Sequence, residues 1–230
     1  MKHLFYIFLL TGILMGCSKT TTMIASWKRP DFVAKKYQKL GVVVFSPRMS
    51  SRAIVETDMA YEFRVRGVKA IGTFDVFPFA GRKDLIQKMD PEELKQKVRQ
   101  RVNDMKMDAL LTITVLDKEK EQRYVQGTNV SVGVGAPIYG AGYPYYSGHA
   151  AYRHSYYGYY AYAAGTVYDN GYYTTTTTYF VETNVYDVET EKLIWTGQTK
   201  TKDPDSLEKE SKKFAKLIVD EILNKQVLVP

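Results

Sequence analysis

Cys17 has the most distinctive chemistry in this chain, because it is the only cysteine and it ends an apolar run. Met1-Lys2-His3 is followed by the 11 mostly apolar residues Leu4 to Leu14, and then by Met15-Gly16-Cys17. A short cationic head, an apolar stretch and small residues before a cut site define a cleavable secretory signal. The stretch is too short for a spanning helix, which needs roughly 20 residues. The sequence therefore predicts export.

Leu14 to Cys17 resembles the lipobox of bacterial lipoproteins. The resemblance implies that residues 1–16 are a signal peptide cleaved before Cys17, and that Cys17 is then acylated on its thiol and on its new amino terminus. Two or three acyl chains hold a protein on a lipid bilayer firmly, because each buried methylene contributes about 0.8 kcal/mol and one chain alone binds only marginally. An ordinary signal peptide with a cysteine near its cut site is the alternative.

The residue that follows the cysteine is Ser18 and not Asp. By resemblance to enteric lipoproteins, this serine favours transport to the outer membrane. Residues 19–22 lack the acids associated with surface export in some other bacteria, which favours the periplasmic face. We therefore expect a lipid-anchored protein of the cell envelope, with residues 17–37 as a lipidated tether.

The second group with distinctive chemistry is the Tyr/Gly-rich segment 128–173. Thirteen tyrosines lie between Tyr139 and Tyr173, interleaved with Gly, Ala, Ser and Pro. Because the segment has no aliphatic periodicity, we expect a disordered loop inserted into a folded domain. Tyrosine pairs an apolar ring face with a hydroxyl, which suits a glycan or matrix contact; the residues expected to make it are Tyr145, Tyr146, Tyr156, Tyr157, Tyr159 and Tyr160. Self-association by β-stacking and a tolerated insertion without a role stay open.

Motifs for catalysis, cofactors and metals are missing from the sequence. No Gly-rich phosphate loop follows the first predicted strand, where Ser46-Pro47-Arg48 stands instead. His3 lies in the signal, and His149 and His154 lie in the Tyr/Gly-rich segment with no acid or thiol between them. We therefore expect no catalytic residues, no cofactor and no metal site, and no enzyme activity.

Two further observations concern the acidic residues and the net charge. A carboxylate pair drawn from Asp75, Asp117 and Asp187 at strand ends stays open, although solvated acids are the simpler reading. The net charge is +7, and it falls by one when Lys2 is removed with the signal. Since the basic residues are scattered among acids, and since the anions outside the cytoplasm are lipids and peptidoglycan carboxylates, we expect no nucleic acid partner.

The rest of the chain predicts an α/β (α+β) domain at 38–227, interrupted by the Tyr/Gly-rich segment. Its elements alternate in the order β-α-β-α-β, then a hairpin, then α, which favours a single mixed sheet with helices packed on it. We expect strands at 40–45, 68–79, 109–126, 174–188 and 193–202, and helices at 50–66, 91–105 and 206–222.

Four local signals refine this expectation. Ser50 or Ser51 is expected to cap the first helix, and Gly67 to end it. Asp90-Pro91 supplies an N-cap and a first-turn proline for the second helix, and Asp203-Pro204-Asp205 should cap the last helix. Arg52 and Glu56 are expected to form a surface pair worth a few tenths of a kcal/mol.

The run Val42-Val43-Val44-Phe45-Ser46, with Arg52, Glu56 and the later segment Asp187 to Trp195, is similar to several small bacterial envelope lipoproteins. Their α/β domain resembles the amino-terminal domain of the Tol–Pal translocation protein TolB. Outer-membrane activators of cell-wall synthases and the curli secretion lipoprotein are related examples. The similarity covers roughly 38–125 and 175–225 and implies a fold and an envelope location, but no specific function.

The sequence thus predicts a membrane-anchored periplasmic lipoprotein that acts as a non-enzymatic binding or assembly factor in the cell envelope. Its expected partners are the bilayer, through acylated Cys17, and peptidoglycan or an envelope protein. The alternative is a structural or adhesive component whose Tyr/Gly-rich arm self-associates or contacts peptidoglycan or glycan.

Overall fold

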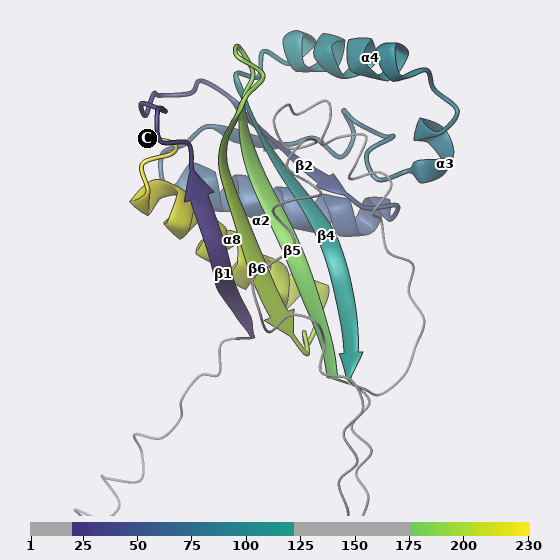
Figure 1. Cartoon of the computed structure of the whole chain (residues 1–230), viewed down its shortest axis with the longest axis vertical. Coiled ribbons are helices and arrows are strands. Elements are labelled where there is room, and N and C mark those ends of the chain that lie inside the picture. Colours follow the sequence, from purple (N-terminus) through teal and green to yellow (C-terminus); the bar gives the residue numbers. More distant parts are fainter. Residues whose placement is uncertain (1–19, 122–175) are drawn as a thin grey trace, which may run out of the picture.

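The computed structural model describes residues 20–121 and 176–230, and these form a six-stranded mixed sheet with helices on it (Figure 1). Cys17, the signal peptide and segment 128–173 lie outside the described residues. In chain order the elements are β1 (Thr21–Lys28), β2 (Leu40–Phe45), α2 (Met49–Val65), β3 (Ala70–Gly72), α3 (Lys83–Ile86), α4 (Pro91–Asp104), β4 (Ala109–Glu121), β5 (Thr176–Asp187), β6 (Leu193–Lys202) and α8 (Leu207–Asn224).

The sheet has the strand order β1-β6-β5-β4-β2-β3. Strand β2 runs parallel to both β3 and β4, whereas the pairs β4–β5, β5–β6 and β1–β6 are antiparallel. This arrangement confirms the predicted single mixed sheet. The β4–β5 ladder extends to the pair Glu121–Thr176, so the intervening segment leaves and re-enters the sheet at neighbouring strand ends.

Two apolar clusters hold the helices on opposite faces of the sheet. On one face α2 and α8 pack side by side over alternate residues of the strands, with Phe63 and Ile218 against Leu111 and Trp195. We refer to it as the α2/α8 face. On the other face, the α4 face, Val98 and its helix neighbours pack with Val43, Leu110 and the turns after β3. The β-branched run of β2 is therefore buried on both sides, as predicted for it.

Helices α2, α4 and α8 end in the same way. Beyond each helix the chain enters the left-handed region at Gly67, Lys106 and Gln226, with φ of 86°, 52° and 51°. In each case the next residue donates its amide to a carbonyl five positions back: Val68 to Phe63, Met107 to Val102, and Val227 to Ile222. These are Schellman caps, and the donors Val68, Met107 and Val227 are buried in the core.

Strand β1 corrects the expectation of a tether through residue 37. Thr21 to Lys28 pairs with residues 195–201 of β6 and forms one edge of the sheet. A bulge between Met23 and Ala25 reverses which side chains face the core, so the sequence of this strand shows no regular alternation. Within the described residues, no helix is both long and apolar enough to cross a membrane.

The structure also differs from the sequence at three element ends. Strand β3 stops at Gly72, not at 79, because the amide of Thr73 donates to Glu56 and the chain then turns, with Val76 and Phe77 donating to the Thr73 carbonyl. The N-cap of α2 is Arg48 and not Ser50 or Ser51. Ser206 caps α8 in place of the aspartates before it, and Asp90 caps α4 as predicted.

Candidate functional site

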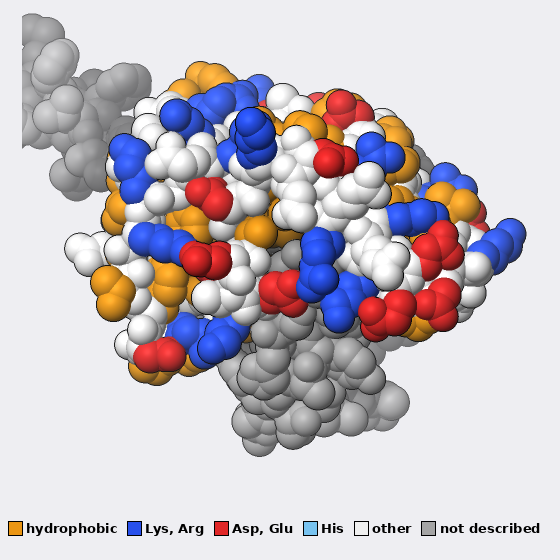
Figure 2. All heavy atoms as spheres, turned by 90° about the horizontal axis from the view of Figure 1, so that it is seen from above, with side chains coloured by type: hydrophobic (Ala, Val, Ile, Leu, Met, Phe, Trp, Pro, Cys, Tyr) orange, Lys and Arg blue, Asp and Glu red, His pale blue; other side chains and the backbone are white. Residues whose placement is uncertain are grey.

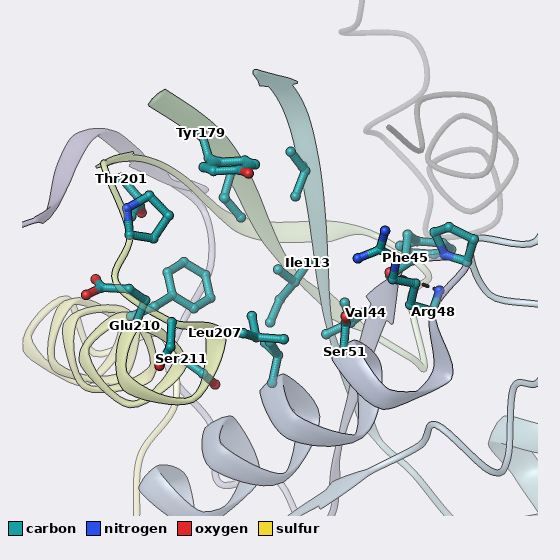
Figure 3. Close-up of a pocket in the computed structure, with 18 of the residues that line it drawn as sticks. Val44, Phe45, Arg48, Ser51, Ile113, Tyr179, Thr201, Leu207, Glu210 and Ser211 are labelled. Atoms are coloured by element: carbon teal, nitrogen blue, oxygen red, sulfur yellow. Dashed lines mark hydrogen bonds between the residues drawn. The ribbon is translucent and has the colours of Figure 1, made fainter. Parts of the chain in front are cut away.

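A cleft opens on the α2/α8 face, between the first turns of the two helices (Figure 3). Its volume is about 710 Å³, within the range of small-molecule sites. Figure 3 shows Arg48 and Thr201 on opposite sides of this cleft, with Ile113 and Leu207 between them. Because β2 ends here, opposite Thr114 of β4, the cleft lies at the carboxyl end of a parallel strand, where α/β sheets commonly bind ligands.

The floor of the cleft is apolar. Strand alternation places Val44, Ile113 and Val181 on the α2/α8 face, and their side chains line the cleft. Val55 of α2 and Phe214 of α8 add the walls. Such a surface gains from contact with an apolar ligand and supplies few hydrogen bonds to fix a polar one.

The α8 side of the cleft carries two acids that already have partners. Glu210 accepts hydrogen bonds from Thr20 (2.6 Å), Thr21 (3.3 Å) and Lys213 (2.8 Å). Burial pushes the pKa of Glu210 upward, but these hydrogen bonds outweigh it and hold the pKa below its ordinary value. Asp205 lies 3.6 Å from the ammonium of Lys209. The carboxylates on this side of the cleft are therefore already paired with lysines.

The α2 side has the opposite character. The N-cap residue Arg48 makes no side-chain hydrogen bond to the first turn, and that turn contains no acid. Unsatisfied amides at a helix start carry partial positive charge. Arg48 and Ser51 line the cleft beside this turn, so this side favours an anionic group.

Next to the cleft, Arg52 and Glu56 form a buried pair, which corrects the expectation of a surface pair. Their side chains are 1% and 0% exposed, and Arg52 Nε lies 3.2 Å from Glu56 Oε1. Glu56 also accepts from the amides of Val44 (2.9 Å) and Thr73 (2.6 Å), and Arg52 donates to the carbonyl of Phe77 (2.7 Å). The pair thus joins α2 to β2 and to the turn after β3.

The environment of this pair shifts the titration of the acid. Burial is the largest influence and raises the pKa of Glu56 to about 7, while Arg52 and the two amides oppose the rise. The Glu56 carboxylate is fully buried, does not line the cleft, and accepts hydrogen bonds from Arg52 and from the amides of Val44 and Thr73. The geometry assigns Arg52 and Glu56 a structural role.

Of the three aspartates considered as a carboxylate pair, Asp117 and Asp187 lie far apart in the sheet. Asp187 pairs with Ala109 at the start of β4, while Asp117 pairs with Phe180 eight residues further along, a separation of roughly 26 Å. Asp75 lies in the turn after β3. Asp187 is structural: it accepts from Tyr37 Oη (2.8 Å) and lies 2.5 Å from Lys35 Nζ.

Other residues singled out in the sequence cannot be placed. Cys17 and the six tyrosines Tyr145, Tyr146, Tyr156, Tyr157, Tyr159 and Tyr160 lie outside the described residues, as do His149 and His154. In the described ranges 20–121 and 176–230, no group of three or more His, Cys, Asp and Glu is arranged to hold a metal ion. From the sequence, none of the cleft residues was assigned to a binding site, because their patterns are those of ordinary core, turn or capping residues.

A second polar set lies on the α4 face of the central strands. Asn184 donates to Glu182 (3.1 Å), and Gln198 on the neighbouring strand donates to the same carboxylate (3.4 Å). The hydroxyls of Thr112 and Thr114 are buried nearby without a hydrogen-bond partner among the described residues. Polar side chains thus replace the apolar ones that pack under α4 nearer the start of β4.

The end of the molecule that carries α4 presents interspersed charges. Figure 2, seen from above, shows Lys and Arg side chains mixed with Asp and Glu over this face. Ion pairs join Lys97 to Glu93 (2.6 Å) and Arg99 to Glu191 (2.8 Å). We find no single-sign patch on this face that would indicate a polyanionic partner.

No family model matches the sequence, and no curated protein matches it. Among solved structures, this chain is similar to the PelC dodecamer from Paraburkholderia phytofirmans, at 9% identity and a TM-score of 0.41, aligned over 86% of this chain and 95% of that one. The lipoprotein GNA1162 from Neisseria meningitidis is aligned over 81% and 98%, at 15% identity and a TM-score of 0.36. Similarity at this level identifies no function for this chain.

Proposed function

We propose that this protein is a lipid-anchored lipoprotein on the periplasmic face of the outer membrane, and that it acts as a non-enzymatic binding factor in the cell envelope. The observation that supports it best is the hydrogen bond from Thr20 to Glu210, because it fixes the start of the folded domain beside the cleft. Cys17 precedes Thr20 by three residues, which span at most about 11 Å.

An anchor that close determines how the domain faces the membrane. Lipid on Cys17 would hold the end of the sheet that contains Thr21, Thr201 and the first turn of α8 against the bilayer (Figure 1). The cleft opens at this end, since Thr201 and Glu210 line it. A ligand or partner would therefore be bound within reach of the lipid surface, and not at the end of a long tether.

The contacts of the cleft favour binding over catalysis. Its acids Glu210 and Asp205 are paired with lysines, and the neighbouring Glu56 is enclosed by Arg52 and backbone amides. A general base needs a carboxylate within hydrogen-bond reach of a substrate proton. Glu56 instead joins α2 to β2, and Glu210 joins α8 to β1.

The anchor is tested by comparing Cys17→Ser with the control Ser18→Ala in the native host. We expect the wild type and Ser18→Ala to fractionate with outer membranes and to show an acylated amino-terminal residue by mass spectrometry. Cys17→Ser should lose both properties. A wild-type protein with a free thiol at residue 17, or a Cys17→Ser variant that stays membrane-bound without lipid, contradicts the proposed anchor.

The adhesive or structural alternative is supported by one observation. The pair Glu121–Thr176 attaches segment 122–175 at the same sheet end as Thr20, so an arm there would start at the bilayer side. Deleting 128–173 leaves a short connection between two strands that are already paired. Sedimentation with purified peptidoglycan separates the two roles: loss of binding on deletion favours the arm, and unchanged binding of peptidoglycan or an envelope protein favours the folded domain.

A further inference from the structure

We propose that the cleft between α2 and α8 binds a single hydrocarbon chain that ends in an anionic group, as in a fatty acid or a lysophospholipid. This inference gives a ligand class to the binding role proposed above and depends on that role for its biological meaning. The observations that carry it are the apolar lining of the cleft, the uncapped first turn of α2, and a buried hydroxyl in the cleft wall.

The body of the ligand follows from the lining. Val44, Ile113 and Val181 of three adjacent strands lie under the cleft, and Val55 and Phe214 stand on its two sides. These side chains offer no hydrogen bonds, so they select a chain of methylenes over a sugar or a peptide backbone, whose polar groups would be left unsatisfied. Binding should therefore strengthen with each methylene that enters the cleft.

The polar end of the ligand follows from the asymmetry of the rim. At the α2 side, the first turn lacks both a side-chain cap and an acid, and Arg48 adds a cation. At the α8 side, Glu210 and Asp205 are already paired with Lys213 and Lys209, so this side offers no comparable positive site to an anion. An anionic head is therefore favoured at α2, and the hydrocarbon chain is directed along the floor toward β5 and β6.

The α8 wall holds an independent indication that a polar atom enters the cleft. Ser211 lines it, is only 3% exposed, and its hydroxyl has no hydrogen-bond partner in the described part of the protein. A buried hydroxyl without a partner is unfavourable. An oxygen of a bound ligand that reaches the α8 wall would accept its proton.

Binding is measured on the mature chain 17–230 carrying Cys17→Ser and produced without the signal peptide. The probe is 11-(dansylamino)undecanoic acid, whose fluorescence rises in an apolar site. We expect saturable binding that palmitate and palmitoyl-lysophosphatidylglycerol each displace, while dodecanol, which lacks the charge, displaces it more weakly. The stronger of the two anionic competitors identifies whether the head is a carboxylate or a phosphate. Absence of saturable binding overturns the proposal.

Two matched pairs of variants locate the site. Val55→Trp fills the cleft and should reduce affinity for all ligands at least ten-fold, whereas Val65→Trp, at the exposed end of the same helix, should leave it unchanged. Arg48→Gln should weaken the anionic probe about two- to five-fold, as expected for one charge at a helix start, and should spare dodecanol. Arg101→Gln in α4 is its control. Equal binding by Val55→Trp and wild type contradicts the assignment.

Two additional measurements keep these results interpretable. Thermal unfolding of every variant shows whether it is folded, and Ser51→Phe on the rim replaces Val55→Trp if that variant does not fold. The chain used carries no lipid, so its failure to bind would remove the ligand assignment and leave the anchor untouched. Loss of membrane association by Cys17→Ser in cells tests the anchor alone.

Discussion

Thr20 donates a 2.6 Å hydrogen bond to Glu210, a residue 190 positions later in the chain. Beside it, Thr21 bonds both Glu210 and Thr201, so the start of β1 is fixed to α8 and to β6 at once. The amide of Lys202 also donates to the Thr20 carbonyl. The folded domain therefore begins three residues after Cys17.

Glu210→Gln should loosen this junction. The variant keeps an oxygen acceptor but loses the charge that Lys213 and the two threonines stabilise, so the free energy of unfolding at pH 7 should fall by about 1–2 kcal/mol. Because the pKa of Glu210 is lowered in the fold, its contribution is present above the ordinary carboxyl pKa and disappears as the pH falls through the lowered value.

Urea unfolding between pH 3 and pH 7 measures this effect, with Glu208→Gln in the same turn as an exposed control. Hydrogen exchange of β1 amides should also accelerate in Glu210→Gln. Equal stability of the two variants at pH 7 would show that the junction contributes nothing.

Arg52→Met should be among the most destabilising single changes in α2. It removes the partner of a carboxylate that is 0% exposed, and breaking a buried pair on one side costs about 3–5 kcal/mol. Arg66→Met is the matched control, because Arg66 makes another i,i+4 pair, with the partly exposed Glu62, and should cost about 1 kcal/mol or less. Chemical denaturation gives both values; similar losses would show that burial of the Arg52 pair has no energetic consequence.

Glu56 should make stability depend on pH near neutrality. Its pKa rises to about 7 in the fold because of burial, against an unperturbed value of 4.5. A raised acid pKa contributes stability that is complete below pH 4.5 and is lost as the pH rises through 7. At 1.36 kcal/mol per unit, the loss between pH 4.5 and 8 is on the order of 3 kcal/mol.

The difference in unfolding free energy between wild type and Glu56→Gln isolates this contribution, because other titrating groups cancel. The unfolding free energy of wild type, relative to that of Glu56→Gln, should increase as the pH falls from 8 to 5. If this relative stability increased as the pH rises, Arg52 and the amides of Val44 and Thr73 would outweigh the cost of burying the charge of Glu56.

Gly197→Ala should disturb the core under α8. A Cβ at this position would lie 2.4 Å from the Trp195 ring, which is fully buried and rigid. Overpacking of this kind costs about 1–3 kcal/mol. Gly41→Ala is a control with a similarly short contact, but to the flexible thioether of Met107, which can move. Thermal unfolding and Trp fluorescence compare them, and an unshifted Trp195 emission with unchanged stability contradicts the expected clash.

The sequence alone determined the elements whose signals are local. The β-branched run of β2, the strand starting at Ala109 and the Asp90-Pro91 start of α4 each carry their cause within a few residues, and each appears where it was predicted. The apolar run and Cys17 similarly define the export prediction by themselves. Gly67 ends its helix as expected. Lys106 and Gln226 adopt the same left-handed conformation although neither is a glycine, so the sequence gives no comparable signal for those two helix ends.

Tertiary structure decided what depends on distant partners. Thr21 to Lys28 forms a strand because it pairs with β6. The bulge near Met23 interrupts the alternation of buried and exposed side chains that would have predicted this strand from the sequence. Arg52 and Glu56 have the spacing of a solvated pair, yet the amides of Val44 and Thr73 draw them into the interior. The cleft arises only where two helix starts meet the ends of three strands. Spacing along one helix or strand fixes which face a side chain takes, but not what lies opposite that face.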